Sequence, residues 1–276
     1  MRKLQRLPMV LLAVIGGCSE RGDGGTDNVA AVGNEPSATV LPTPQPPLDR
    51  EALLIATLRA ASAAATGAND AGAQRALDAR PFALVLRFGC PGSDVGRDGS
   101  VEERGDAENR SVLLRSRPDV SLDDPLLVPN VEPAGIEAVE GFWITRPWLL
   151  TAACPPPPAA PAAAGEEQRP SMDPAAAPAQ RRVAIAQFFT GEDTRVGRRS
   201  ERPFEAVLKA DQARDLKENG FNLVLAGRLR AMRDGKVIRC TVTDPRRPPD
   251  CLISARFDQV RMEHPRTGAV LAQWAD

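Results

Sequence analysis

Five cysteines carry most of the reactive chemistry in this sequence. Cys18 follows a short apolar stretch near the N-terminus, whereas Cys90, Cys154, Cys240 and Cys251 are spread over the long remainder of the chain. A cysteine thiol can accept a lipid, form a disulfide, ligate a metal or act as a nucleophile. The residues around each cysteine decide which of these chemistries applies.

Residues 1–17 have the order of an export signal, with basic residues at the start and an apolar run over residues 7–14. That run is too short for a membrane-spanning helix, which needs about 20 apolar residues. The closing segment Ile15-Gly16-Gly17-Cys18 resembles the lipobox of bacterial lipoproteins, with Ile15 where Leu is commoner. The resemblance covers residues 1–18 alone. The alternative is an ordinary cleavable signal in which Cys18 stands by chance.

The lipobox resemblance implies that Cys18 is acylated and becomes the new N-terminus. A single acyl chain binds membranes only marginally, so several chains on one cysteine are what make such an anchor durable. Ser19, in place of Asp, implies sorting to the outer membrane of a Gram-negative cell. We therefore expect a protein of the cell envelope that is attached to a membrane through Cys18.

The four other cysteines are an even number in a chain that we expect to be exported, which predicts disulfides. Four cysteines allow three pairings. Cys240 and Cys251 flank a Pro- and Arg-rich loop over residues 244–250 and lie beside strand-like sequence, so a bond between them would join a hairpin. Cys90 and Cys154 are then left for each other. Unbonded structural thiols are the alternative.

Most catalytic motifs are absent from the sequence. The single histidine, His264, precedes Pro265 and a Thr-Gly turn, so we expect it in a loop. A zinc site needs several His or Cys ligands, and the cysteines are expected to be oxidised. The sequence contains no P-loop, no G-x-G-x-x-G and no G-x-S-x-G motif. We therefore expect no catalytic residue, no metal and no cofactor.

Residues 141–154 (GFWITRPWLLTAAC) resemble the strand pair that leads to the catalytic His of trypsin-like serine proteases. Here Ala153 is followed directly by Cys154, so that His is missing, and no G-D-S-G-G stretch follows. Without an imidazole, the attacking hydroxyl has no proton acceptor. We interpret this resemblance as coincidence.

Two acidic pairs, Glu102-Glu103 and Asp123-Asp124, keep one enzymatic hypothesis open. Paired carboxylates serve glycosidases, so the alternative function is a carboxylate-dependent periplasmic hydrolase that acts on envelope glycans. Adjacent acids in a polar loop are more often simply solvated. Phe142, Trp143 and Trp148 could line a ligand groove, but in a chain with 4% aromatic residues we expect them in the core.

Composition and hydrophobic spacing predict the order of the chain. Residues 18–48 are rich in small and polar residues and predict a disordered tether. The other segments are an N-terminal lobe over residues 49–154, a Pro/Ala-rich linker or loop over residues 155–180, and a C-terminal antiparallel β lobe over residues 181–276. The predicted fold class is α+β and β-rich, an antiparallel sheet or meander with one or two N-terminal helices.

The individual elements follow from periodicity. We expect an amphipathic helix over residues 49–59, a second turn or two near residues 73–79 and a short helix that ends at Gly220. A turn at Arg233-Asp234-Gly235 should return residues 221–229 to residues 236–243 as a hairpin. A change of face near Asp258-Gln259 predicts a bulge. Further strands are expected over residues 81–88, 111–115, 136–145, 148–154, 183–190, 204–209, 253–262 and 269–274, and a loop over residues 89–106.

Charge is distributed unevenly. Residues 49–180 hold 12 Arg and Lys against 19 Asp and Glu, a net charge of −7, and residues 181–276 hold 19 against 13, a net charge of +6. Either the two lobes pair through charge, or the basic lobe meets anionic glycans or lipid head groups. The chain has 31 Arg against 4 Lys, a bias that we attribute to the codon usage of a GC-rich genome. The Arg content therefore does not indicate nucleic-acid binding, and we expect no nucleic-acid partner. The sequence therefore favours a non-enzymatic, membrane-anchored envelope lipoprotein with a structural or binding role.

Overall fold

The computed structural model describes residues 45–90, 100–105, 110–124, 126–127, 135–154, 182–191, 198–199, 202–209, 211, 213 and 215–275. They belong to one unit that extends from Pro44 to Asp276. The signal segment with Cys18, nearly all of the expected tether and the Pro/Ala-rich segment over residues 155–180 lie outside the described residues. The described chain begins beside the sheet, where the N–H of Leu48 donates to the carbonyl oxygen of Pro81 at 2.8 Å.

The longest helix, α1 (Arg50–Thr66), starts and stops at residues suited to those positions. The Asp49 side chain accepts the N–H of Ala52 at 2.9 Å, and Gly67 ends the helix with φ of 68°. Glycine adopts this left-handed conformation at little cost, and α1 ends here, seven residues beyond the predicted end at residue 59. Two shorter helices are α2 (Ala71–Leu77) and α4 (Leu216–Asn219), and α4 ends at Gly220 as predicted.

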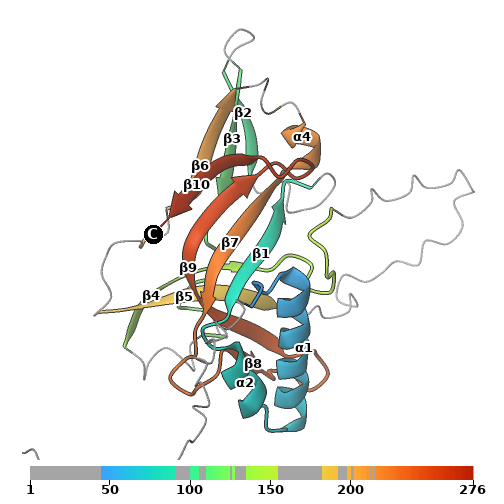
Figure 1. Cartoon of the computed structure of the whole chain (residues 1–276), viewed down its shortest axis with the longest axis vertical. Helices are drawn as coiled ribbons and strands as arrows, with labels where there is room; N and C mark the ends of the chain where they lie inside the picture. Colours follow the sequence, from blue (N-terminus) through green and yellow to red (C-terminus); the bar gives the residue numbers. More distant parts are fainter. Residues whose placement is uncertain are drawn as a thin grey trace, which may run out of the picture. The chain divides into compact units, whose positions relative to one another are not determined.

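In the part of the chain that the structure describes, ten strands form two sheets. The larger sheet has the order β1-β7-β9-β5-β4, and β8 and β10 both pair with β9; the smaller has the order β2-β3-β6. Figure 1 shows α1 and α2 beside the lower part of the larger sheet, near β8 and β1. The strand bounds are β1 (Pro81–Phe88), β2 (Val101–Arg104), β3 (Ser111–Ser116), β4 (Ile136–Trp143), β5 (Val183–Thr190), β6 (Phe204–Lys209), β7 (Phe221–Leu229), β8 (Ile238–Thr241), β9 (Asp250–Glu263) and β10 (Val270–Ala275).

The 14-residue strand β9 organises the larger sheet. Its first half lies between β5 and β8, and its second half lies between β7 and β10. Ala226 pairs with Gln259 and Gly227 pairs with Phe257, so Asp258 is the extra residue of a bulge at the predicted place. A Cβ on Gly227 would lie 2.0 Å from the carbonyl oxygen of Arg256, which explains why glycine stands opposite the bulge.

The strand-rich fold with a few helices agrees with the predicted class, but the antiparallel meander is wrong in two places. β5 pairs with β9 in parallel, so the larger sheet is mixed. β8 pairs with β9 rather than with β7, so the turn at residues 233–235 does not close a hairpin between sheet neighbours. Alternation in a sequence indicates which residues share a face of a strand, but not which strand becomes the partner.

Two shorter segments also differ from the prediction. Residues 148–154 form no strand, and residues 101–104 form β2 within the stretch that was expected to be a loop. The core contains Phe142, which is 2% exposed, whereas Trp148 is 54% exposed and the expectation that it lies in the core is wrong. Trp143 is half-buried with the Arg182 guanidinium carbon 4.1 Å from its ring centre. Within the described chain, no helix is long and apolar enough to cross a membrane.

Candidate binding site and disulfides

The larger sheet has an opening along one edge of β9. On that edge β9 pairs with β5 over residues 251–254 and with β10 over residues 259–263. Among the strands that the structure describes, none pairs with this edge over residues 255–258. The bulge at Asp258 lies in this interval, and bulges commonly mark functional positions because they redirect side chains.

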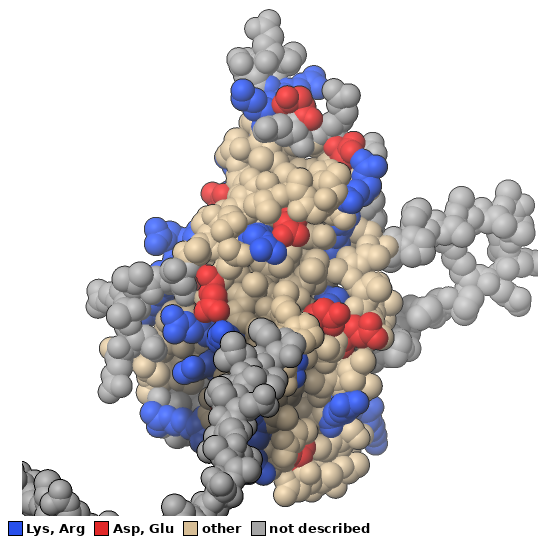
Figure 2. Space-filling view, viewed as in Figure 1, with Lys and Arg blue, Asp and Glu red and all other residues tan. Residues whose placement is uncertain are grey.

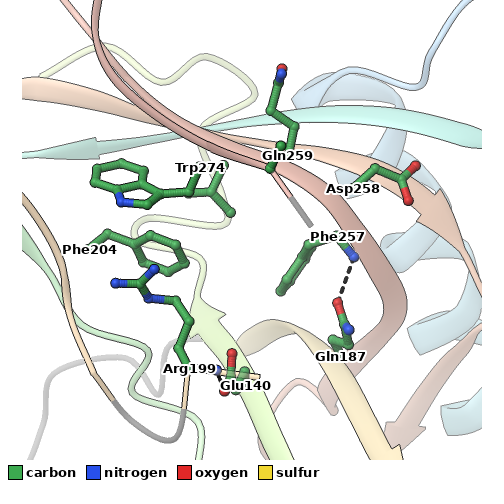
Figure 3. A pocket seen from close by; sticks show the side chains of 10 residues that line it. Glu140, Gln187, Arg199, Phe204, Phe257, Asp258, Gln259 and Trp274 are labelled. Carbon is green, nitrogen blue, oxygen red and sulfur yellow. Dashed lines mark hydrogen bonds between the residues drawn. The ribbon is translucent and has the colours of Figure 1, made fainter. Parts of the chain in front are cut away.

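A cavity of about 160 Å³ lies at this opening, and we call it the β9 hollow. Small-molecule pockets usually measure about 300–1,000 Å³, so this hollow suits one ring or terminal group rather than a whole drug-sized ligand. Figure 3 shows Trp274 and Phe204 on one side of it and Phe257 and Gln187 on the other. Its lining consists of Glu140, Gln187, Arg199, Phe204, Phe257, Asp258, Gln259, Val260, Trp274 and Ala275.

Arg199 is held in the hollow by rings and by backbone acceptors. Its guanidinium carbon lies 4.3 Å from the ring centre of Phe204 and 5.9 Å from that of Trp274, which are cation–π distances. The guanidinium donates to the carbonyl oxygens of Pro203 at 2.9 Å and of Arg202 at 3.3 Å. Burial, followed by the positive charge of Arg202, lowers the pKa of Arg199, while Glu140 opposes that shift.

The other polar groups of the hollow are ordered as well. Glu140 is 7% exposed, and its Oε1 accepts the backbone N–H of Arg199 at 2.6 Å. The Oε1 of Gln187 accepts the backbone N–H of Phe257 at 2.7 Å, the dashed line in Figure 3. The Gln187 side chain therefore supplies the acceptor that a neighbouring strand would otherwise offer to β9. Its amide NH2 group can still donate hydrogen bonds.

The acidic pairs named from the sequence do not meet in one site. Glu102 and Glu103 are exposed neighbours on β2, and side chains of adjacent strand residues point to opposite faces. Asp124 pairs with Arg182 at 2.8 Å, which attaches the start of β5 to the segment after β3. The β9 hollow has two acids of its own in Glu140 and Asp258, but Figure 3 shows the Asp258 carboxylate pointing away from Glu140.

His264 lies in the turn between β9 and β10, as predicted. Its Nδ1 accepts the backbone N–H of Arg266 at 3.3 Å and that of Thr267 at 3.4 Å, so the ring supports the turn. Among the described residues, no group of three or more His, Cys, Asp or Glu is placed to hold a metal ion.

Both expected disulfides are present. Cys90 bonds to Cys154 and joins the end of β1 to the segment after β4. Cys240 bonds to Cys251 and joins β8 to β9 at directly paired positions. The two strands are antiparallel and flank the Pro- and Arg-rich loop, so this bond joins a hairpin as predicted.

Sequence reasoning missed the β9 hollow. Arg199 and Phe204 are near each other in the chain, but Trp274 follows Phe204 by 70 positions and comes beside them through the long β9 strand and the β9–β10 hairpin. The one signal that pointed here was the change of face at Asp258-Gln259, which correctly located the bulge at its edge.

No protein-family model matches this chain, and neither a curated protein nor a solved structure shows a significant similarity to it.

Proposed function

We propose that this chain is a non-enzymatic lipoprotein of the Gram-negative outer membrane, anchored through lipid on Cys18, whose folded unit binds an envelope glycan at the β9 hollow. The anchor follows from the order of basic, apolar and small residues before Cys18. The ligand class follows from the chemistry of the hollow. The observation that carries the proposal is a small opening with an indole and a phenyl ring on one side and already ordered polar side chains around it.

A sugar ring suits this combination of groups. The C–H face of a pyranose packs on an aromatic ring such as that of Trp274, and its hydroxyls need donors and acceptors at fixed positions. Gln187 and Arg199 are fixed by their bonds to the backbone, so little side-chain entropy is lost when they bind. The volume of about 160 Å³ limits the occupant to one ring of a longer chain.

An acidic substituent on the glycan would find further positive charge nearby. Residues 181–276 carry a net charge of +6. Within the hollow, the positive charge of Arg202 is close enough to lower the pKa of Arg199. In Figure 2, Lys and Arg predominate over Asp and Glu in the lower part of the visible face. We therefore propose an anionic glycan that carries carboxylate or phosphate groups, recognised mainly through its ring.

The second candidate is a carboxylate-dependent hydrolase, favoured by the presence of Glu140 and Asp258 in one hollow. Such an enzyme needs two carboxyl groups that face one glycosidic bond. Glu140 already accepts a backbone N–H, and Asp258 points outward. Release of reducing ends from a glycan, abolished by E140Q, would favour the hydrolase over the binding protein.

Binding to defined glycans tests the ligand site. The lipidated full chain in detergent should bind a muropeptide or a phosphorylated lipopolysaccharide core oligosaccharide by calorimetry. W274A should weaken that binding at least about fivefold, because stacking on an aromatic side chain contributes about 1–3 kcal/mol. W148A is the matched control, since Trp148 is an exposed tryptophan that does not line the hollow. Equal losses in both variants, or binding to neither glycan, would contradict the proposal.

The anchor is tested separately in cells. C18S should lose the lipid mass on its N-terminal peptide and leave the detergent phase. S19D should keep the lipid but be retained in the inner membrane. A C18S protein that still carries lipid, or a wild-type protein found only in inner-membrane fractions, would contradict the anchor and leave the ligand site untouched.

A further inference from the structure

Three arginines surround the Cys90–Cys154 disulfide, and two of them contact its sulfur atoms. The Nε–H of Arg87 donates to Cys154 Sγ at 3.3 Å, and the guanidinium of Arg146 donates to Cys90 Sγ at 3.5 Å. The third, Arg50, is 6% exposed and approaches the backbone of Arg146. Each bonded sulfur therefore already has a cation beside it.

No acid of the described residues cancels these three positive charges. Among the described residues, Arg50, Arg87 and Arg146 form no ion pair with a carboxylate. Their acceptors are carbonyl oxygens, the Asn222 side chain and the two sulfurs. Burial, followed by the charge of Arg146, lowers the pKa of both Arg50 and Arg87, which agrees with an uncompensated positive region.

We propose that the Cys90–Cys154 disulfide is redox-active and exchanges with the two thiols of a dithiol-bearing protein of the cell envelope. A thiolate beside Arg is stabilised relative to the neutral thiol, and a stabilised reduced form makes a disulfide more oxidising. The proposal concerns a site apart from the β9 hollow and does not depend on glycan binding.

The difference in exposure between the two sulfurs defines the order of steps. Cys90 is 2% exposed, whereas Cys154 is half-buried, so the partner's thiolate attacks Cys154 Sγ. The disulfide breaks, and its electron pair leaves on Cys90 Sγ as a thiolate beside Arg146. The partner's second thiol loses its proton to water and attacks the partner sulfur of the mixed disulfide, which releases Cys154 as a thiolate beside Arg87. The partner leaves as a disulfide, and Cys90 and Cys154 have gained its two electrons.

The surroundings also keep the reduced cysteines near each other. Arg50 donates to the carbonyl oxygens of Thr145, Arg146 and Leu149 at 2.8, 3.1 and 3.2 Å, and to that of Val85 on β1 at 3.3 Å. These bonds hold the segment after β4 against β1 without the help of the disulfide. The pair can therefore be reoxidised without refolding.

Equilibration with dithiothreitol tests the proposal, with Cys240–Cys251 as the internal reference. The lipidated full chain in detergent is equilibrated with graded mixtures of reduced and oxidised dithiothreitol, quenched in acid, alkylated and read by mass spectrometry at each cysteine. We expect the equilibrium for Cys90–Cys154 to favour reduction at least tenfold more than that for Cys240–Cys251, which corresponds to about 30 mV. Equal equilibria, or earlier reduction of Cys240–Cys251, would overturn the proposal.

Variants that remove one arginine charge distinguish a redox-active disulfide from an ordinary structural one. R146Q and R87Q should each shift the Cys90–Cys154 equilibrium about threefold to tenfold towards the disulfide, because each removes one cation from a thiolate. The matched control is R239Q, because Arg239 adjoins Cys240 but pairs with Asp234 at 2.8 Å. R87K keeps the charge if R87Q does not fold, and it should retain the wild-type equilibrium. No shift in R146Q, or an equal shift in R239Q, would overturn the proposal.

Discussion

The arginines around the Cys90–Cys154 disulfide and Arg199 in the β9 hollow are held in opposite electrostatic settings. Near the disulfide, Arg50, Arg87 and Arg146 donate to carbonyl oxygens and sulfurs, and their charges add. In the hollow, Arg202 adds positive charge beside Arg199, but Glu140 and Glu205 oppose it, and the Glu140 carboxylate accepts the backbone N–H of Arg199 at 2.6 Å. Arginine therefore supplies net positive charge around the disulfide, whereas in the β9 hollow it mainly supplies hydrogen-bond donors in fixed positions.

This difference indicates what each region can recognise. An uncompensated set of guanidinium groups stabilises an anion that forms in place, such as a cysteine thiolate. The Arg199 guanidinium, which donates to backbone carbonyl oxygens and stacks on Phe204, instead presents donors in fixed directions beside an aromatic surface. The first setting suits thiol–disulfide exchange, and the second suits a ring with hydroxyl groups.

The largest expected effect concerns the stability of the disulfide region. R50M leaves four carbonyl contacts without their donor in a site that is 6% exposed, and it should lower the free energy of unfolding by about 3 kcal/mol. R59M, on an exposed position of the same helix, should change it by less than about 0.5 kcal/mol. Urea unfolding measures both. Similar losses in the two variants would show that Arg50 is not the contact that holds the segment after β4.

The next effect is the acidity of the reduced cysteines. In the reduced protein, the pKa of Cys154 should lie below the ordinary thiol value, because Arg87 stabilises the thiolate. R87Q should raise that pKa, and the rate of iodoacetamide alkylation against pH gives its value. Against dithiothreitol, whose thiols keep their protons to higher pH, reduction of Cys90–Cys154 should become more favourable as the pH rises through the lowered thiol pKa, because the reduced protein then releases a proton. A pKa at or above the ordinary value would remove the electrostatic difference between the two regions.

The smallest effect is the salt dependence of the β9 hollow. Because Glu140 opposes the charge of Arg199, an acidic substituent on the glycan should add less than about 1 kcal/mol to binding, and added salt should remove that increment. A neutral oligosaccharide of the same ring should bind with an affinity that changes little with salt. If only the acidic glycan bound, and if its affinity fell steeply with ionic strength, the hollow would act through net charge, like the disulfide region.

The sequence predicted local features of the fold well because those features depend on near neighbours. The eight-residue run of β1 and the bulge at Asp258 were both found from periodicity, and the spacing and compartment of the cysteines led to the observed bonds. Partner choice between strands was not found, because the parallel pairing of β5 with β9 depends on packing between residues about 70 positions apart in the chain.

The candidate sites show the same limit. Arg50 lies in the helix predicted over residues 49–59, and nothing in the sequence distinguished it, yet its acceptors include residues 95 to 99 positions away. Trp148 was expected in the core because aromatic residues are scarce, but it is 54% exposed, and residues 148–154 form no strand. Neither contact nor exposure could be read from composition, since both require the tertiary arrangement.

The central claim, a ring-binding site at the β9 hollow, can be tested most directly by nuclear magnetic resonance. The chain has three tryptophans, and each indole N–H gives its own signal. On titration with the muropeptide or the core oligosaccharide, the Trp274 signal should move in proportion to occupancy while those of Trp143 and Trp148 stay in place. Movement of the Trp148 signal alone, or no movement of the Trp274 signal at saturating glycan, would contradict the assignment of this hollow as the binding site.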